Sequence, residues 1–223
     1  IMGAMPDEVD QLCARLSGVE VQQYAGVEYH QGRLGDKEVV VCCAGMGKAN
    51  AAATTQVLCG KFGAQAIIFS GIAGNMSEEI GIGDVVVGKE VCYHDAEVSM
   101  ICQSAPFLKS YTGDPALVQA ALDACAALGV KAIAGRIATG DTFVGDGATK
   151  AVIAEKVHPD CVEMEGAAVS QIAARNGVPC VVLRAMSDNA DESGHELLVV
   201  KKFSIAEYVT TATAIVARML ESL

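Results

Sequence analysis

Residues 179–191 read Pro-Cys-Val-Val-Leu-Arg-Ala-Met-Ser-Asp-Asn-Ala-Asp, and this stretch decides the expected fold class. Its apolar run, Cys180 to Leu183, follows turn-forming residues and contains β-branched side chains, which is typical of a strand buried on both faces in a parallel sheet. We expect the strand to end where Arg184, Ser187 and Asp188 appear. Ligands of open α/β sheets bind beyond the carboxyl ends of the strands, so these three residues are candidates for a site. The alternative is a solvated loop in which Ser187 or Asp188 caps the next helix.

The composition is that of a globular chain with a sizeable core. Of its 223 residues, 52% are hydrophobic and 19% are charged, so disorder is excluded for most of the length. Connections are short and no linker is apparent, so we expect a single domain over residues 1–223. The formal net charge of −11 repels phosphate backbones and anionic lipid. We therefore expect no nucleic-acid partner and no membrane partner, which leaves small molecules and proteins.

Nine cysteines are scattered along the chain, several of them inside apolar runs. An odd number of core-like cysteines without a Cys-x-x-Cys pair favours a reducing, cytoplasmic location and gives no support for a zinc site. No apolar run approaches the roughly 18 residues of a membrane span, and no signal peptide is visible. Residues 1–3 look like the tail of a strand, so we expect a few residues upstream of Ile1.

Strand-like and helix-like segments alternate along the chain. We expect strands at 1–5, 27–31, 38–43, 66–70, 84–93, 131–138, 161–164 and 180–183, and helices at 6–16, 48–61, 115–128, 149–157, 165–175 and 205–220. Residues 71–75 are expected to form a glycine-rich turn, and residues 101–113 a loop. This alternation predicts a doubly wound α/β domain with a ligand crevice along one edge of the sheet.

Four further residues at strand ends are candidates for this crevice. Glu8 follows a strand in the first turn of a helix that begins at Pro6, where it either stabilises the helix dipole or faces a ligand. Phe143 lies in a polar loop and either stacks on a planar ligand or plugs the local core. Glu163 and Glu165 lie at a strand-to-helix junction. Their alternative is one helix-start glutamate and one surface glutamate.

Two motifs fit no complete pattern. Gly45-Met46-Gly47-Lys48 leads into a helix and allows close backbone approach to a ligand, but its spacing matches neither the P-loop nor the dinucleotide fingerprint. His94 and Asp95 are neighbours at a strand end and would point to opposite faces, so they do not form a ready-made catalytic pair. We expect a structural histidine.

The candidates together favour one kind of chemistry. Three carboxylates (Glu8, Glu165 and Asp188), one aromatic ring and many backbone N–H groups suit the cleavage of a neutral, planar, sugar-bearing ligand. One carboxylic acid protonates the leaving group, one carboxylate activates water, and another binds hydroxyls. Glycoside hydrolysis through an oxocarbenium-like transition state uses the same logic.

Seven motifs in order, from Gly3 to about Asp191, resemble the 5'-methylthioadenosine/S-adenosylhomocysteine nucleosidase family: Gly3-Ala4-Met5-Pro6-Asp7-Glu8-Val9, Gly45-Met46-Gly47-Lys48, Gly71-Ile72-Ala73-Gly74, Tyr93-His94-Asp95-Ala96, Gly140-Asp141-Thr142-Phe143-Val144, Val162-Glu163-Met164-Glu165 and Arg184-Ala185-Met186-Ser187-Asp188. The resemblance implies a three-layer nucleoside phosphorylase-like fold, whose central mixed, partly barrel-like sheet is flanked by helices. It also implies hydrolysis of an adenine N-glycosidic bond in methionine salvage, without metal or organic cofactor. The choice among methylthioadenosine, adenosylhomocysteine, 5'-deoxyadenosine and aminodeoxyfutalosine stays open.

The resemblance also implies a role for each matching residue. Glu8 would activate the attacking water, and Asp188, oriented by Ser187, would protonate adenine N7. Glu165 would hold the ribose hydroxyls, and Arg184 would support the site from behind. The other residues implied to contact substrate are Met5, Ile72, Ala73, Gly74, Phe143 (stacked on adenine), Val144, Glu163 and Met164.

The resemblance further implies a homodimer in which the segment after Asp95 reaches towards the neighbour's 5'-substituent pocket. The sequence departs from the family pattern after Asp191, where relatives usually have an aromatic residue near the 5' substituent. Leu197, Leu198 or Phe203 would fill that role here. The alternatives are a purine nucleoside phosphorylase of the same fold, which needs arginines for phosphate, and a non-catalytic nucleoside-binding relative, which should have lost a carboxylate.

Overall fold

The computed structural model describes residues 1–195 and 206–223, which form a mixed α/β structure. The strands are β1 (Met2–Gly3), β2 (Ser17–Tyr24), β3 (Val27–Leu34), β4 (Lys37–Cys43), β5 (Ile67–Asn75), β6 (Val85–Tyr93), β7 (Tyr111–Thr112), β8 (Ala132–Thr139), β9 (Cys161–Glu163) and β10 (Cys180–Asp188). The helices are α1 (Pro6–Cys13), α2 (Lys48–Gly60), α3 (Val98–Ile101), α4 (Pro115–Ala127), α5 (Gly147–Val157), α6 (Gly166–Asn176), α7 (Glu192–His195) and α8 (Ala206–Leu220).

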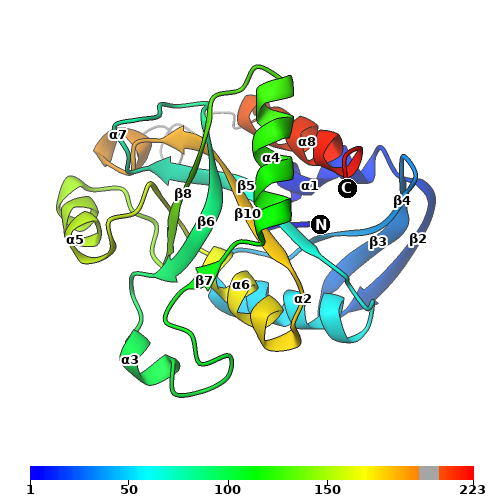
Figure 1. Cartoon of the computed structure of the whole chain (residues 1–223), viewed down its shortest axis with the longest axis horizontal. Coiled ribbons are helices and arrows are strands. Elements are labelled where there is room, and N and C mark those ends of the chain that lie inside the picture. The colour runs from blue at the N-terminus through cyan, green and yellow to red at the C-terminus, as the bar shows by residue number, and fades with distance from the viewer. Residues whose placement is uncertain (196–205) are drawn as a thin grey trace.

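Five strands close into a barrel-like ring (Figure 1). Around the ring, β10 pairs antiparallel with β6, β6 and β8 pair in parallel, β8 and β9 pair in parallel, β9 pairs antiparallel with β5, and β5 returns in parallel to β10. From β5 the sheet continues through β1, β4, β3 and β2. The mixed, partly barrel-like sheet implied by the resemblance is confirmed. It differs from an open doubly wound sheet because β5 also pairs with β10, which closes the ring, and because two of the ring's strand pairs are antiparallel.

Helices cover both faces of this sheet and complete three layers (Figure 1). On one face α1, α4 and α8 pack over Ile68, Val181 and Leu183, and on the other α2 and α6 pack over Phe69 and Val182. Neighbouring residues of β5 and β10 thus point into different cores, which confirms that these strands are buried on both faces. No helix in the described ranges is long and apolar enough to cross a membrane.

Several expected boundaries were wrong. The Gly71–Asn75 segment continues strand β5 instead of forming a turn, and β10 extends to Asp188 instead of ending before Arg184. Strand β2 was missed because its side chains are almost all exposed and its apolar alternation is limited to Val19 and Val21. Helix α1 ends at Cys13, and the segment at 101–113 contains the end of α3 and all of β7.

A β-bulge shapes the end of β10. Its register with β5 shifts between Met186 and Asp188, where the partner residues are Ala73 and Gly74. An extra residue in one strand re-aims the side chains that follow it. Ser187 and Asp188 are both buried, as is every residue of β10, and beside the bulge their side chains come together, with the Ser187 hydroxyl 2.8 Å from Asp188 Oδ2.

Candidate active site

The predicted site residues gather at one end of the barrel-like ring. Strands β5 and β10 run parallel there, and β9 pairs with the last residues of β5, so Gly71–Asn75, Glu163–Glu165 and Arg184–Asp188 converge. Glu8 joins them from the first turn of α1, which follows β1. The structure thus brings these strand-end residues together, and their roles as a site stay predictions.

Glu8 is buried and tightly held by the backbone. Its Oε2 accepts hydrogen bonds from the N–H groups of Ala4 (2.6 Å) and Met5 (3.0 Å), and its Oε1 accepts one from Ile72 (3.1 Å). Burial raises the pKa of Glu8, while Arg184 and the three N–H groups offset part of that rise. A carboxylate has about four acceptor positions, so Oε1 keeps one position for a further donor.

Arg184 is the cation to which the carboxylates are bound. Its side chain is only 1% exposed and lies over the ring of Phe69, with Cζ 4.2 Å from the ring centroid. Nη2 donates a hydrogen bond to Glu163 and lies 3.5 Å from Oε2 of Glu165. Burial alone would lower the pKa of Arg184, but Glu163, Glu165 and Glu8 raise it, so the guanidinium stays charged.

Glu163 is held by four donors from the protein. It accepts hydrogen bonds from the Thr139 hydroxyl, from Arg184, and from the N–H groups of Glu165 (3.1 Å) and Gly166 (2.7 Å). Three of these bonds end on Oε2 and one on Oε1, so they fix the start of α6 and leave Oε1 one acceptor position. Glu163 therefore holds Arg184 and α6 in place and also lines the pocket. Its predicted part in substrate binding stays a prediction.

Glu165 is buried but keeps free acceptor positions. Its Oε1 accepts the N–H of Gly47 at 2.8 Å, and Arg184 approaches Oε2. Burial and the neighbouring charge of Glu163 raise the pKa of Glu165 to about 7. Its charge therefore changes near neutral pH, and ligand hydroxyls can still bind to it.

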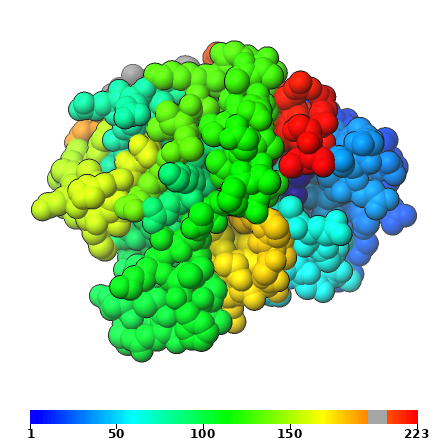
Figure 2. Space-filling model, viewed as in Figure 1, coloured from blue at the N-terminus to red at the C-terminus, as the bar shows by residue number. Residues whose placement is uncertain are grey.

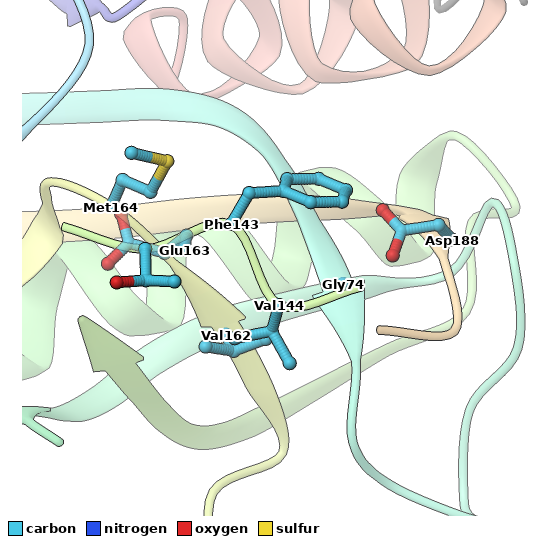
Figure 3. Close-up of a pocket in the computed structure, with 8 residues that line it drawn as sticks. Gly74, Phe143, Val144, Val162, Glu163, Met164 and Asp188 are labelled. Carbon is cyan, nitrogen blue, oxygen red and sulfur yellow. The ribbon is translucent and has the colours of Figure 1, made fainter. Parts of the chain in front are cut away.

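Beside these carboxylates is a cavity of about 240 Å³, including the part that opens to solvent (Figure 3). Figure 3 shows the ring of Phe143 between the side chain of Met164 and the carboxylate of Asp188. The lining residues are Gly74, Thr142, Phe143, Val144, Val162, Glu163, Met164 and Asp188.

Asp188 is oriented by its own segment. Its Oδ1 accepts the N–H of Ala190 at 2.8 Å, and its Oδ2 is 2.8 Å from the hydroxyl of Ser187. That hydroxyl also lies 3.3 Å from the carbonyl oxygen of Ala73. A Cβ atom at Gly74 would come within 3.0 Å of Oδ1, so only glycine leaves this carboxylate in place.

Gly71 lets the side chains of Arg184 and Glu8 lie directly against the backbone of β5. A Cβ atom added there would overlap both Nη1 of Arg184 and the carboxylate of Glu8. Gly3 is similarly tight, because its Cβ would be 2.8 Å from Cβ of Glu8. Two glycines on neighbouring strands thus make room for an ion cluster that side chains would displace.

The remaining predictions have mixed outcomes. Ala73 is buried, and Met5 and Ile72 are half-buried beside Glu8. Sequence reasoning missed the hydroxyl of Thr139 and the N–H of Gly47, since neither residue type marks a site by itself. Leu197, Leu198 and Phe203 lie outside the described residues. Over residues 1–195 and 206–223, no group of three or more His, Cys, Asp or Glu side chains is arranged to hold a metal ion.

Comparison with known proteins identifies the same family that the sequence motifs resemble. The model of the Phosphorylase superfamily matches residues 1–221. The 5'-methylthioadenosine/S-adenosylhomocysteine nucleosidase of Shewanella sediminis is 41% identical over 197 residues, 86% of each chain. A crystal structure of the nucleosidase of that name from Neisseria meningitidis, in complex with methylthio-immucillin-A, matches with a TM-score of 0.92 and 30% identity, covering 100% of this chain and 97% of that one.

A second type of enzyme has a similar structure. The futalosine hydrolase of Helicobacter pylori matches with a TM-score of 0.90 and 28% identity, covering 100% of this chain and 96% of that one. The superfamily match spans nearly the whole chain, and the nucleosidase of Shewanella sediminis matches over most of its own length. The chain therefore belongs to the Phosphorylase superfamily and, within it, to the 5'-methylthioadenosine/S-adenosylhomocysteine nucleosidase family.

Proposed function

We propose that this protein hydrolyses the N-glycosidic bond of 5'-substituted adenine nucleosides, 5'-methylthioadenosine and S-adenosylhomocysteine first, to adenine and the 5'-substituted ribose. The proposal rests above all on the buried Glu8 carboxylate, which occupies three backbone N–H groups beside Arg184. The futalosine hydrolase of similar structure keeps aminodeoxyfutalosine as a candidate substrate, and 5'-deoxyadenosine remains another. The reaction would belong to methionine salvage in the cytoplasm.

Glu8 is the proposed general base. Its pKa is raised by burial, which makes the carboxylate a stronger base than one in water. The backbone donors leave Oε1 one acceptor position, and a water bound there could give up its proton as it attacks the anomeric carbon. Because Glu8 is already fixed by three hydrogen bonds, little reorganisation is needed during the reaction.

Asp188 is the proposed general acid. Adenine leaves poorly until N7 is protonated, and Asp188 is the carboxyl group at the end of the pocket that contains Phe143. The Ser187 hydroxyl donates to Oδ2 and so fixes the orientation of the carboxyl group. Ser187 would therefore hold the acid in place while its proton passes to N7.

The remaining pocket residues suit an adenine nucleoside. Phe143 would stack on the base, and the backbone of Val144 would contact its edge. Glu165, with its free acceptor positions, would bind the ribose hydroxyls, and Met5, Ile72, Ala73, Gly74 and Met164 would line the sugar and base. Arg184, engaged by Glu163, supports Glu165 from behind.

The main alternative is that the protein is a phosphorylase with the same fold. It must bind a phosphate dianion beside the sugar, through arginine or a nest of N–H donors. Here the N–H groups of Ala4, Met5 and Ile72 are occupied by Glu8, whose negative charge would repel phosphate at short range. A non-catalytic binding protein is also disfavoured, because Glu8, Glu165 and Asp188 are all retained.

Adenine should be released at the full rate in phosphate-free buffer, with free 5'-substituted ribose as the second product. Glu8→Gln should nearly abolish release, since the amide cannot accept the proton of water, while binding of a transition-state analogue largely survives. Liquid chromatography of both products with and without added phosphate measures this. Strict dependence on phosphate, with a ribose 1-phosphate product, would overturn the assignment.

Asp188→Asn should lower turnover by on the order of 10²–10⁴-fold, because the amide keeps the shape of the acid but carries no transferable proton. Substrate binding should change little. Steady-state kinetics with methylthioadenosine tests this, and Asp123→Asn on the exposed face of α4 serves as the control. Near wild-type turnover in Asp188→Asn would show that another group protonates the base.

We also propose that the protein is a homodimer. The segment around α3 stands out as a lobe in Figure 2, and it exposes Met100 (63%), Phe107 (69%) and Leu108 (44%). Clustered apolar exposure of this kind marks interaction surfaces. By family resemblance, the segment would reach the 5'-substituent pocket of the second copy.

Sedimentation at micromolar concentration should give twice the chain mass of 23.0 kDa. Phe107→Glu should weaken the dimer, because it places charge in an apolar interface, and should raise KM for the 5'-substituted substrates. A wild-type monomer with full activity would contradict the idea that a second copy completes the site.

A further inference from the structure

Three charged residues from different sequence motifs have no role in the proposed reaction, yet they meet at one point. Lys48 Nζ donates to both carboxylate oxygens of Asp95, at 2.8 and 2.7 Å, and lies 3.5 Å from Oδ2 of Asp141. The N–H of Asp141 also donates to Asp95, at 2.9 Å. The cluster Lys48–Asp95–Asp141 therefore joins the start of α2, the end of β6 and the loop after β8.

This cluster holds the N-terminus of α2 against Glu165. Helix α2 has glycine at its N-cap, so no side chain of its own satisfies the first N–H groups. Carboxylates from elsewhere do so instead. The N–H of Lys48 donates to Asp141 Oδ1 (2.8 Å), and the N–H of Gly47 donates to Glu165 Oε1 (2.8 Å). The position of Glu165 thus depends on how the turn at Gly47 is held.

The turn at Gly47 has a backbone conformation that few residues can adopt, and the ion pair beside it is partly buried. Gly47 has φ of +93°, which only glycine adopts easily, and a Cβ atom there would be 3.2 Å from Asp141 Oδ1. Burial alone would raise the pKa of Asp95, but Lys48 and the Asp141 N–H outweigh it and hold that pKa below its ordinary value. The Lys48 and Asp95 side chains are 24% and 26% exposed, so their ion pair is partly shielded from solvent.

Asp141 also lies two residues before Phe143. Its N–H and its carboxylate are both engaged by the cluster, which fixes the entry into the loop that carries the aromatic ring. The same three side chains therefore support both sides of the pocket, the carboxylate at the sugar position and the aromatic ring at the base position.

We propose that Lys48, Asp95 and Asp141 form a positioning cluster that sets where the Gly47 N–H holds Glu165, and so controls recognition of the ribose hydroxyls. The inference rests on the proposed role of Glu165 in binding those hydroxyls. None of the three cluster residues is required to touch the reacting atoms.

The test is substrate discrimination in Lys48→Met, Lys48→Arg and Asp95→Asn. In Lys48→Met the turn at Gly47 loosens, so kcat/KM for methylthioadenosine should fall by roughly 10–100-fold, as expected when a substrate-binding group is misplaced by about 1 Å. The fall should be much smaller for the 3'-deoxy analogue, which offers Glu165 one hydroxyl fewer. Asp95→Asn should cause a smaller fall in kcat/KM of the same kind. Lys48→Arg keeps the positive charge and should retain most of the discrimination between the two substrates.

Glu90→Gln is the matched control. Glu90 also lies on β6, pairs with Arg136 at 2.7 Å, and has a side chain 33% exposed, but it contacts no site residue. Like Asp95→Asn, Glu90→Gln removes one half-buried ion pair, so any loss that reflects folding stability should appear in both of these variants. Only the cluster variants should lose discrimination between the two substrates.

A pH profile and a double mutant complete the test. The Gly47 N–H lowers the pKa of Glu165, which Glu163, Arg184 and Glu8 also face, so loss of that bond in Lys48→Met should move the acid limb of kcat/KM to higher pH. Glu165 must be ionised to accept hydroxyls well, and activity is therefore lost as pH falls through this limb. In the Glu165→Gln background, Lys48→Met should cost little more.

Equal losses for both substrates, an unmoved acid limb, or full additivity with Glu165→Gln would each overturn the positioning role. A different result would contradict the proposed role of Glu165 in binding the hydroxyls. If Glu165→Gln itself leaves discrimination between the two substrates unchanged, then Glu165 does not bind the hydroxyls, and both proposals are overturned together.

Discussion

One buried guanidinium determines how the rest of this site is arranged. Arg184 pairs with Glu163, approaches Glu165, and stabilises Glu8 electrostatically, all in a region where side chains are almost fully buried. Taking charges out of water costs several kcal/mol per ion, and this cost is recovered only when the charges are paired and fully hydrogen-bonded. Three carboxylates around one cation leave an excess of negative charge, and the pKa values of Glu8 and Glu165 are raised as burial requires. In the proposed reaction, the same excess would stabilise the positive sugar of the transition state.

The fold makes room for this cluster through small residues. Closure of the five-strand ring brings β5 beside β10, and Gly71 then lies against Arg184 and Glu8 with no space for a side chain. Beside the β-bulge near Asp188, the consecutive side chains of Ser187 and Asp188 lie within hydrogen-bond distance of each other. Further out, the N-terminus of α2 donates N–H groups to carboxylates from two other segments. Backbone donors and missing side chains therefore shape the site as much as the charged residues do.

The sequence was sufficient for the architecture but not for several boundaries. Buried runs such as residues 66–70 and 180–183 predicted strands covered on both faces, and the family resemblance implied the mixed, partly barrel-like sheet. In the exposed strand β2 the apolar alternation is limited to Val19 and Val21, which is too short to distinguish it from a loop. The second halves of β5 and β10 are rich in polar and glycine residues, so local propensity does not predict strands there. Tertiary contacts with Glu8 and Arg184 stabilise the extended backbone instead.

Within the site, side chains were easier to predict than their partners. Charged residues at strand ends marked Glu163 and Glu165, whereas the bonds that hold them, from the Thr139 hydroxyl to Glu163 and from the Gly47 N–H to Glu165, could not be predicted from a single sequence. The four donors on Glu163 are likewise brought together by three-dimensional contacts alone. The single-domain expectation and the individual catalytic roles stay predictions.

The most direct test of Arg184 as the organising charge is its free energy of unfolding, measured in urea at pH 8, where Glu165 is ionised. Arg184→Met alone should lose roughly 3–5 kcal/mol, because it leaves buried carboxylates without their cation. The triple variant Arg184→Met/Glu163→Gln/Glu165→Gln should regain most of that loss. Two of the three carboxylates that Arg184 stabilises are then uncharged and need no cation. Equal losses in the single and triple variants would contradict the central role of the ion cluster.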